Sequence, residues 1–168
     1  MRAFDDLLGN DHSVNLHGVE AVESEHILSD GINMHYGAFE DLLFEDSFDI
    51  ACMIELIEHL FEPEVVLNKL FETLKPGGIA YLSTPNWYGA DFQFIGDAYR
   101  NLRAPTHIQF FNPQSLTRLM ERCGFVNVVI DTPGILDVSL ILKHAPTLIN
   151  QIDSTDESGS MRCIAVRP

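Results

Sequence analysis

Residues 48–86 constrain the fold of this chain more than any other stretch. Their sequence is FDIACMIELIEHLFEPEVVLNKLFETLKPGGIAYLSTPN, in which an apolar run, an amphipathic segment and a second apolar run follow one another. Pro63 suits the first position of a helix, and Gly77 suits the left-handed conformation just after a helix end. A strand, a helix and a strand in this order predict a parallel sheet with helices on its faces.

A ligand is expected at the carboxyl ends of the two predicted strands, because open parallel sheets bind ligands beyond these ends. The ends correspond to residues 53–59 and 83–86. The predicted helix repeats Val66, Leu70 and Leu74 at intervals of four residues. This spacing predicts one helix face that packs in a core.

Composition and charge narrow the class of protein. With 168 residues and 46% hydrophobic content, the chain is expected to form one domain with a packed core. Its net charge of -15 repels phosphate backbones and anionic membranes, so nucleic acid is not an expected partner. The N-terminus lacks the apolar core of a signal peptide, and no run approaches the roughly 18 apolar residues that a membrane span needs. We expect a soluble, cytoplasmic protein.

The three cysteines are Cys52, Cys123 and Cys163, which are widely separated and set in apolar surroundings. They are expected to be reduced and buried. Since the chain has no C-x-x-C pair, a structural zinc site has no support.

Further elements are predicted on both sides of the central stretch. Asn112 and Pro113 begin a helix whose inward face is expected to hold Leu116, Leu119, Met120 and Cys123. Further strands are predicted at residues 14–20, 32–36, 126–130 and 161–166, and short helices at residues 1–8 and 24–29. Within the single domain, residues 87–111 are expected to form an aromatic lid, and residues 133–160 an insertion before the last strand.

Four segments carry a resemblance to a known family: FDIACMIELIEHL, LKPGGIAYLSTPN, THIQFFNPQSLTRLMERCGF and MRCIAVRP. They resemble the second half of a class I S-adenosylmethionine-dependent methyltransferase, of the group that includes ubiquinone-biosynthesis O-methyltransferases. The resemblance implies an α/β, Rossmann-like methyltransferase sheet, mostly parallel with a C-terminal antiparallel hairpin. It implies S-adenosylmethionine as the cofactor and methyl transfer to a small-molecule acceptor. The alternative is a non-catalytic domain of this fold that acts in association or binding.

The resemblance also assigns residues to the cofactor. Glu20 matches the strand-end acid that accepts hydrogen bonds from the ribose hydroxyls, although a strand-end acid can equally face water. Phe39 and Glu40 match the loop that borders the adenine, and Cys52 and Met53 would lie along the methionine arm. The same residues are natural as a core phenylalanine, a surface acid and strand-core side chains.

Glu55, Glu58 and His59 have the spacing i, i+3 and i+4, which on a helix places three possible ligands on one face. The similar ubiquinone-pathway enzymes hold a divalent cation with this segment, and whether a metal binds here is left open. His59 as a general base is the second hypothesis, because an imidazole titrates near neutrality. His107 matches a family histidine on the lid side and could serve instead. Both histidines could also be hydrogen-bonded structural residues.

The glycine-rich cofactor loop of the family has no counterpart in this chain. If Glu20 is the ribose-binding acid, this loop would precede it by about 20 residues and fall at or before Met1, so we expect an N-terminally truncated methyltransferase domain that lacks the first strand. The sheet is then expected to divide into a two-stranded and a four-stranded piece with unpaired edges. Either residues 14–20 pair with the strand at Phe48, or a second copy covers the edge in a homodimer.

Overall fold

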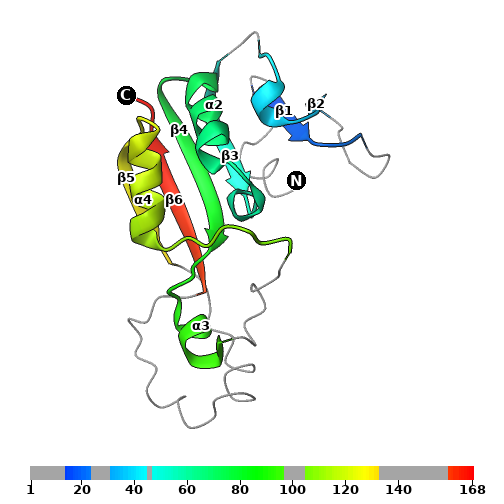
Figure 1. Ribbon diagram of the computed structural model, residues 1–168. Coiled ribbons are helices and arrows are strands. Elements are labelled where there is room, and N and C mark those ends of the chain that lie inside the picture. Colours follow the sequence, from blue (N-terminus) through cyan, green and yellow to red (C-terminus); the bar gives the residue numbers. More distant parts are fainter. Residues whose placement is uncertain (1–13, 24–30, 45–46, 97–104, 133–158) are drawn as a thin grey trace. The chain divides into compact units, whose positions relative to one another are not determined.

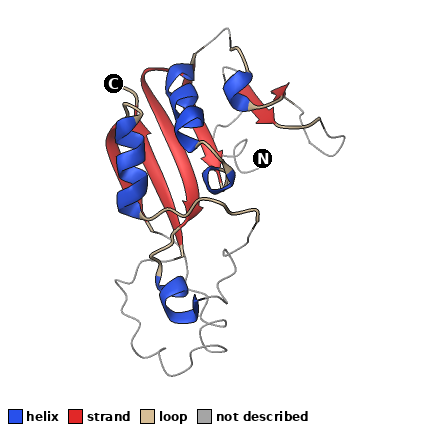
Figure 2. Cartoon of the chain, in the orientation of Figure 1, coloured by secondary structure: helices blue, strands red, loops and turns tan. Residues whose placement is uncertain are grey.

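The computed structural model of the chain describes residues 14–23, 31–44, 47–96, 105–132 and 159–168. The chain has two compact units, Met1–Phe44 and Glu45–Pro168 (Figures 1 and 2). The helices predicted at residues 1–8 and 24–29 lie outside the described residues, as does most of the predicted insertion at residues 133–160.

The first unit contains a two-stranded parallel sheet. Strand β1 (Leu16–Glu20) pairs with β2 (Ile32–Tyr36), and a short 3-10 helix, η1 (Phe39–Asp41), follows β2. Both strands were predicted from the sequence. β1 forms its sheet with β2 and belongs to a different unit from the strand at Phe48, so the expected pairing of residues 14–20 with that strand stays a prediction.

Polar side chains connect β1 to β2 on one face of this small sheet. Asn33 Nδ2 donates a hydrogen bond to Asn15 Oδ1 at 2.8 Å, and His17 Nδ1 lies 2.8 Å from His35 Nε2. The two imidazole rings are stacked, with centroids 5.1 Å apart. Since alternate residues of a strand share a face, these two pairs fix the register that brings the carboxyl ends of β1 and β2 together.

The second unit is built on a four-stranded sheet with the order β3-β4-β6-β5 (Figure 1). Its strands are β3 (Phe48–Ile54), β4 (Leu74–Pro85), β5 (Val126–Asp131) and β6 (Ser160–Val166). β3 and β4 are parallel, whereas β6 is antiparallel to both β4 and β5. The predicted α/β sheet with a C-terminal antiparallel hairpin is confirmed. Among the described strands of this unit, β3 pairs with β4 alone.

Two helices cover one face of this sheet, α2 (Pro63–Thr73) and α4 (Pro113–Arg122) (Figure 1). Asn112 caps α4 as predicted: its Oδ1 accepts from the Ser115 N–H at 2.8 Å, and Ser115 Oγ accepts from the Asn112 N–H at 2.9 Å. The buried apolar residues of these two helices are Val66, Leu67, Leu70, Leu116, Leu119 and Met120, with Cys123 just beyond α4. The shorter helices of the unit are η2 (Ile57–His59) and α3 (Ala90–Ile95). No helix in the described part of the chain is long and apolar enough to cross a membrane.

The LKPGG segment directly follows α2 and forms the beginning of β4. Gly77 has a φ of +81°, the left-handed conformation that the sequence predicted for it, but α2 already ends at Thr73. Arg167 explains the early end, because its Nη1 donates to the carbonyls of Glu72, at 3.1 Å, and Leu74. Its guanidinium also lies 4.8 Å from the centroid of the Phe71 ring. Carbonyls of the last helical turn lack partners within the helix, so these bonds stabilise the exit from α2.

The described residues leave the other face of the four-stranded sheet exposed. Alternation along the strands places the buried Met53 and Leu82 on the covered face and Ile54, which is 58% exposed, on the open face. Cys52 also belongs to the open face and is exposed, so the expectation of three buried cysteines is wrong at this position. Cys123 and Cys163 are buried as predicted, and burial raises the pKa of the Cys163 thiol to about 12.

Candidate functional site

The carboxyl ends of β1 and β2 hold three residues that the sequence assigned to the cofactor. Glu20 is the last residue of β1, and its carbonyl accepts a hydrogen bond from the Gly37 N–H at 2.9 Å. Phe39 and Glu40 follow within η1 at the same end of this sheet. Glu20 and Glu40 are exposed, whereas Phe39 is half-buried. The structure thus brings the two acids and the ring to one end of the first unit, and their contact with a cofactor stays a prediction.

A second group of polar residues lies at the carboxyl ends of β3 and β4, and Glu58 is its centre. Glu58 belongs to η2 and is only 2% exposed. Its Oε2 accepts a hydrogen bond from Thr84 Oγ1 at 2.9 Å, and Thr84 is itself fully buried on β4. Glu58 Oε1 has no hydrogen-bond partner among the described residues. An unsatisfied buried group of this kind costs about 1–3 kcal/mol, more when it is charged, so such a position needs a compensating role.

His59 presents a defined nitrogen to this carboxylate. Its Nδ1 lies 2.8 Å from the Thr106 carbonyl oxygen, which can only accept a hydrogen bond, so Nδ1 carries the proton. In the neutral imidazole Nε2 therefore holds the lone pair. Nε2 lies 3.9 Å from Glu58 Oε1, which is too long for a hydrogen bond. The nitrogen that can accept a proton or a metal ion thus faces the unpartnered carboxylate oxygen.

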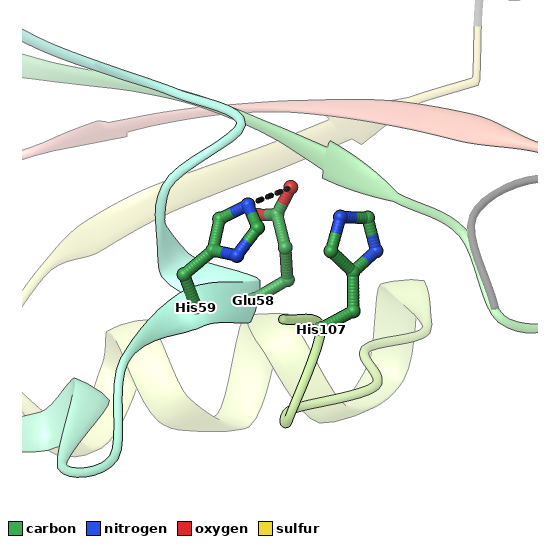
Figure 3. Close-up of side chains that lie close together, drawn as sticks. All are labelled: Glu58, His59 and His107. Carbon is green, nitrogen blue, oxygen red and sulfur yellow. Dashed lines mark ion pairs between the residues drawn. The ribbon is translucent and has the colours of Figure 1, made fainter. Parts of the chain in front are cut away.

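His107 completes the cluster from a distant part of the chain. The N–H groups of Ile108 and Gln109 both donate to the Glu58 carbonyl at 3.0 Å, which fixes this segment beside η2. The His107 ring meets the His59 ring edge-on, with centroids 4.6 Å apart and an interplanar angle of 82°. Figure 3 shows the side chains of Glu58 and His59, from η2, turned toward His107. The two histidines that the sequence proposed as catalytic therefore lie in one site.

Glu55 does not join this cluster, which corrects the expected helical set of Glu55, Glu58 and His59. Glu55 has a φ of +47°, and η2 begins only at Ile57, so the three residues do not share one helix face. Ser83 holds Glu55 instead, because Ser83 Oγ donates to Glu55 Oε1 at 2.8 Å and the Ser83 carbonyl accepts from the Glu55 N–H at 3.0 Å. Desolvation raises the pKa of the Glu55 carboxyl, and the Ser83 bond partly opposes this shift.

Two further predictions concern residues around the cluster. Met53 is 4% exposed on the covered face of β3, and its contact with a cofactor stays a prediction. In the expected lid, Trp87 stacks on Phe92 with centroids 4.0 Å apart and meets Phe110 at 4.4 Å. The Trp87 N–H donates to the Phe111 carbonyl at 2.8 Å, so the first and last residues of the predicted lid are hydrogen-bonded to each other.

Two partners that orient the cluster were not predicted individually from the sequence. Thr84 is a fully buried polar residue near the end of β4 and donates to Glu58, and the Thr106 carbonyl fixes the proton on His59. A signal for Thr84 was present, since S-T-P-N places polar residues at the end of an apolar strand. The Thr106 contact has no local signal because it is a backbone contact across 47 residues of sequence.

Replacement of Glu58 by glutamine is expected to raise the free energy of unfolding by about 1 kcal/mol. The amide oxygen can keep the hydrogen bond from Thr84, while the amide NH₂ takes the place of the unpartnered Oε1 and faces the lone pair of His59 Nε2. Urea unfolding of Glu58→Gln and wild-type protein at neutral pH measures the difference. A clear loss of stability would show instead that the charged carboxylate supports the fold.

Comparison with solved structures defines the class of fold. A SAM-dependent methyltransferase from Archaeoglobus fulgidus superposes with a TM-score of 0.66 at 16% identity, covering 98% of this chain and 81% of that one. A SAM-dependent methyltransferase from Thermotoga maritima gives a TM-score of 0.65 at 21% identity, covering 91% of this chain and 73% of that one. The fold is that of the Rossmann-like methyltransferases, as the sequence predicted.

The sequence also matches the family described as Methyltransferase domain over residues 4–130. The chain belongs to this family, which confirms the resemblance to class I methyltransferases. A Mycolicibacterium smegmatis protein, named as a probable S-adenosylmethionine-dependent methyltransferase, is 32% identical over 123 residues, or 70% of this chain and 45% of that protein. The ubiquinone biosynthesis O-methyltransferase of Xylella fastidiosa is 37% identical over 110 residues, or 59% and 44% of the two chains. The chain thus spans about half the length of the curated relatives it matches.

Proposed function

We propose that this chain takes part in methyl transfer from S-adenosylmethionine to a small-molecule acceptor, with His59 as the general base and His107 beside it. The observation that carries this proposal is the hydrogen bond from His59 Nδ1 to the Thr106 carbonyl, because it presents the lone pair of Nε2 beside a buried carboxylate. Family membership and the similar relatives support the reaction class.

The residues at the end of the first unit suit the cofactor in their chemistry. The exposed Glu20 carboxylate has the acceptor oxygens that ribose hydroxyls need, and Phe39 offers a ring for the adenine, with Glu40 next to it. Met53, at the end of β3, is the proposed neighbour of the methionine arm. When bound, S-adenosylmethionine supplies an electrophilic methyl group on a positively charged sulfur.

The residues of the second unit would handle the acceptor. A hydroxyl or amine acceptor that takes the methyl group of the bound cofactor would have to lose a proton. His59 Nε2 takes this proton, and the Glu58 carboxylate at 3.9 Å stabilises the resulting imidazolium. The hydrogen bond to the Thr106 carbonyl fixes the orientation of the His59 ring. Trp87, Phe92 and Phe110 form an aromatic cluster that suits a planar or lipid-like acceptor.

Calorimetric titration with S-adenosylhomocysteine tests the cofactor half of this proposal. Wild-type protein is expected to bind, and Glu20→Gln is expected to bind at least about 10-fold more weakly, because hydrogen bonds to a charged group contribute about 1.5–3 kcal/mol. Glu23→Gln is the matched control: Glu23 is an exposed acid shortly after β1, and its replacement should leave the affinity unchanged.

Absence of heat at millimolar ligand would remove the enzymatic role of these residues and favour a non-catalytic domain that acts in association or binding. Equal affinities of wild type and Glu20→Gln would instead retain cofactor binding and reject Glu20 as the ribose acid.

A further inference from the structure

We propose that Glu58, His59 and His107 form a binding site for a transition-metal ion of the zinc class. Each residue offers one ligand atom, and the three atoms all lie within 4.8 Å of one another. Figure 3 shows them converging from η2 and from the segment before α4. A shared ion would join two parts of the chain that are far apart in sequence.

The buried carboxylate provides the first independent support. Glu58 is 2% exposed, and Oε1, the oxygen nearest to His59, has no hydrogen-bond partner among the described residues. Thr84 holds the other oxygen at 2.9 Å, which fixes the carboxylate plane and keeps Oε1 turned toward the histidines. An oriented, unpartnered and buried anionic oxygen is the environment in which a cation is most strongly favoured over water.

The orientation of His59 provides the second support. Metal-binding histidines almost always donate their other ring N–H to a carbonyl or carboxylate, which leaves the ligating nitrogen unprotonated. His59 makes this bond through Nδ1 to the Thr106 carbonyl at 2.8 Å, and Nε2 faces Glu58. The imidazole is therefore already in the tautomer that a metal needs.

The ligand types select the metal. Imidazole suits zinc and its neighbours in the first transition row, whereas magnesium and calcium prefer sets made of oxygen. Two histidines and one carboxylate are also a known set for zinc, which leaves a fourth position for a water or a substrate atom. Two ligands of one zinc ion lie at most about 4.4 Å apart, since each is roughly 2.0–2.2 Å from the metal. The three ligand atoms of Glu58, His59 and His107 lie within 4.8 Å of one another, so the proposed site requires them to draw together by a few tenths of an ångström when the ion binds.

This ligand set differs from the one that the sequence spacing indicated. Glu55 is held by Ser83 and has a left-handed backbone, so it lies outside the cluster, and His107 takes its place. A ligand set with two imidazoles and one carboxylate favours zinc more, and hard cations less, than a set with two carboxylates and one imidazole. A bound ion would occupy the lone pair of His59 Nε2, so the metal-bound form and the form in which His59 accepts a proton exclude one another.

Titration of chelator-treated protein with Zn²⁺ and with Co²⁺ at pH 7.5 tests the site without any need for methyl transfer. We expect a single equivalent to bind tightly, with visible absorption from Co²⁺ in a four-coordinate site. Glu58→Gln, His59→Asn and His107→Asn are each expected to weaken this binding at least about 100-fold, because loss of an outer-shell partner alone costs 10–100-fold. Glu55→Gln is the matched control and should leave the affinity unchanged.

Thermal unfolding without metal shows whether each variant is folded, and His59→Asn keeps a side-chain donor for the Thr106 carbonyl. Two outcomes would overturn the site. The first is that the wild-type protein binds neither Zn²⁺ nor Co²⁺ below millimolar concentrations. The second is that Glu55→Gln loses metal binding while His107→Asn retains it.

Discussion

Replacement of His59 by asparagine is expected to lower the rate of methyl transfer by about 10²–10⁴-fold, the usual contribution of a positioned general base. Asparagine retains an amide N–H near the position of Nδ1, so it can still donate to the Thr106 carbonyl. It lacks any group at the position of Nε2, so the acceptor proton has no base. The affinity for S-adenosylhomocysteine should stay the same, because the proposed cofactor residues Glu20, Phe39 and Glu40 lie on other elements.

The rate of S-adenosylhomocysteine formation at saturating acceptor measures this effect, with a chelator present so that metal does not contribute. Arg118→Gln, on the exposed side of α4, is the control and should retain the wild-type rate. A His59→Asn enzyme with unchanged rate would assign His59 a structural role and leave His107 as the candidate base. Because cofactor binding is measured separately, a failure of His59 as the base is distinguishable from a failure of the proposed reaction.

The strands and helices of the second unit were predictable because their signals are local. Pro63 and Asn112 mark the helix starts, and β3 and β4 contain the apolar runs IACMI and IAYL. The division into two-stranded and four-stranded sheets followed from the family order of strands. The end of α2 was not predictable, because Arg167, from the end of the chain, stabilises the carbonyls where the helix stops.

Each residue of the candidate site could be singled out from the sequence, but which of these residues lie together could not be predicted. The spacing of Glu55, Glu58 and His59 predicts one helix face only if the helix begins at Glu55, and the left-handed φ of Glu55 prevents this. His107 is held at the site because the N–H groups of the next two residues, Ile108 and Gln109, donate hydrogen bonds to the Glu58 carbonyl. No sequence pattern predicts these contacts. Cys52 was expected to be buried and is exposed, because the sequence of an apolar strand does not show which of its two faces is covered.

Replacement of Leu82 by alanine is expected to have the largest effect on stability. Leu82 is fully buried in β4 beside Met53, and truncation of a buried leucine costs about 2–5 kcal/mol. For a chain of this size that corresponds to a fall in Tm of ~4–20 °C. Ile54→Ala is the matched control, since Ile54 lies on the neighbouring strand with its side chain 58% exposed on the open face. Its replacement should change the free energy of unfolding by about 0.5 kcal/mol or less, as for other surface positions.

The same pair of variants tests the predicted homodimer. If a second copy covers the open face and the free edge of β3, Ile54 is buried in the assembly, and Ile54→Ala should destabilise it in a way that depends on protein concentration. Thermal unfolding over a range of concentrations, with light scattering on the same samples, separates the two cases. A small and concentration-independent effect of Ile54→Ala, on a monomer that loses several kcal/mol with Leu82→Ala, would show that the covered face alone stabilises the sheet and would reject the dimer.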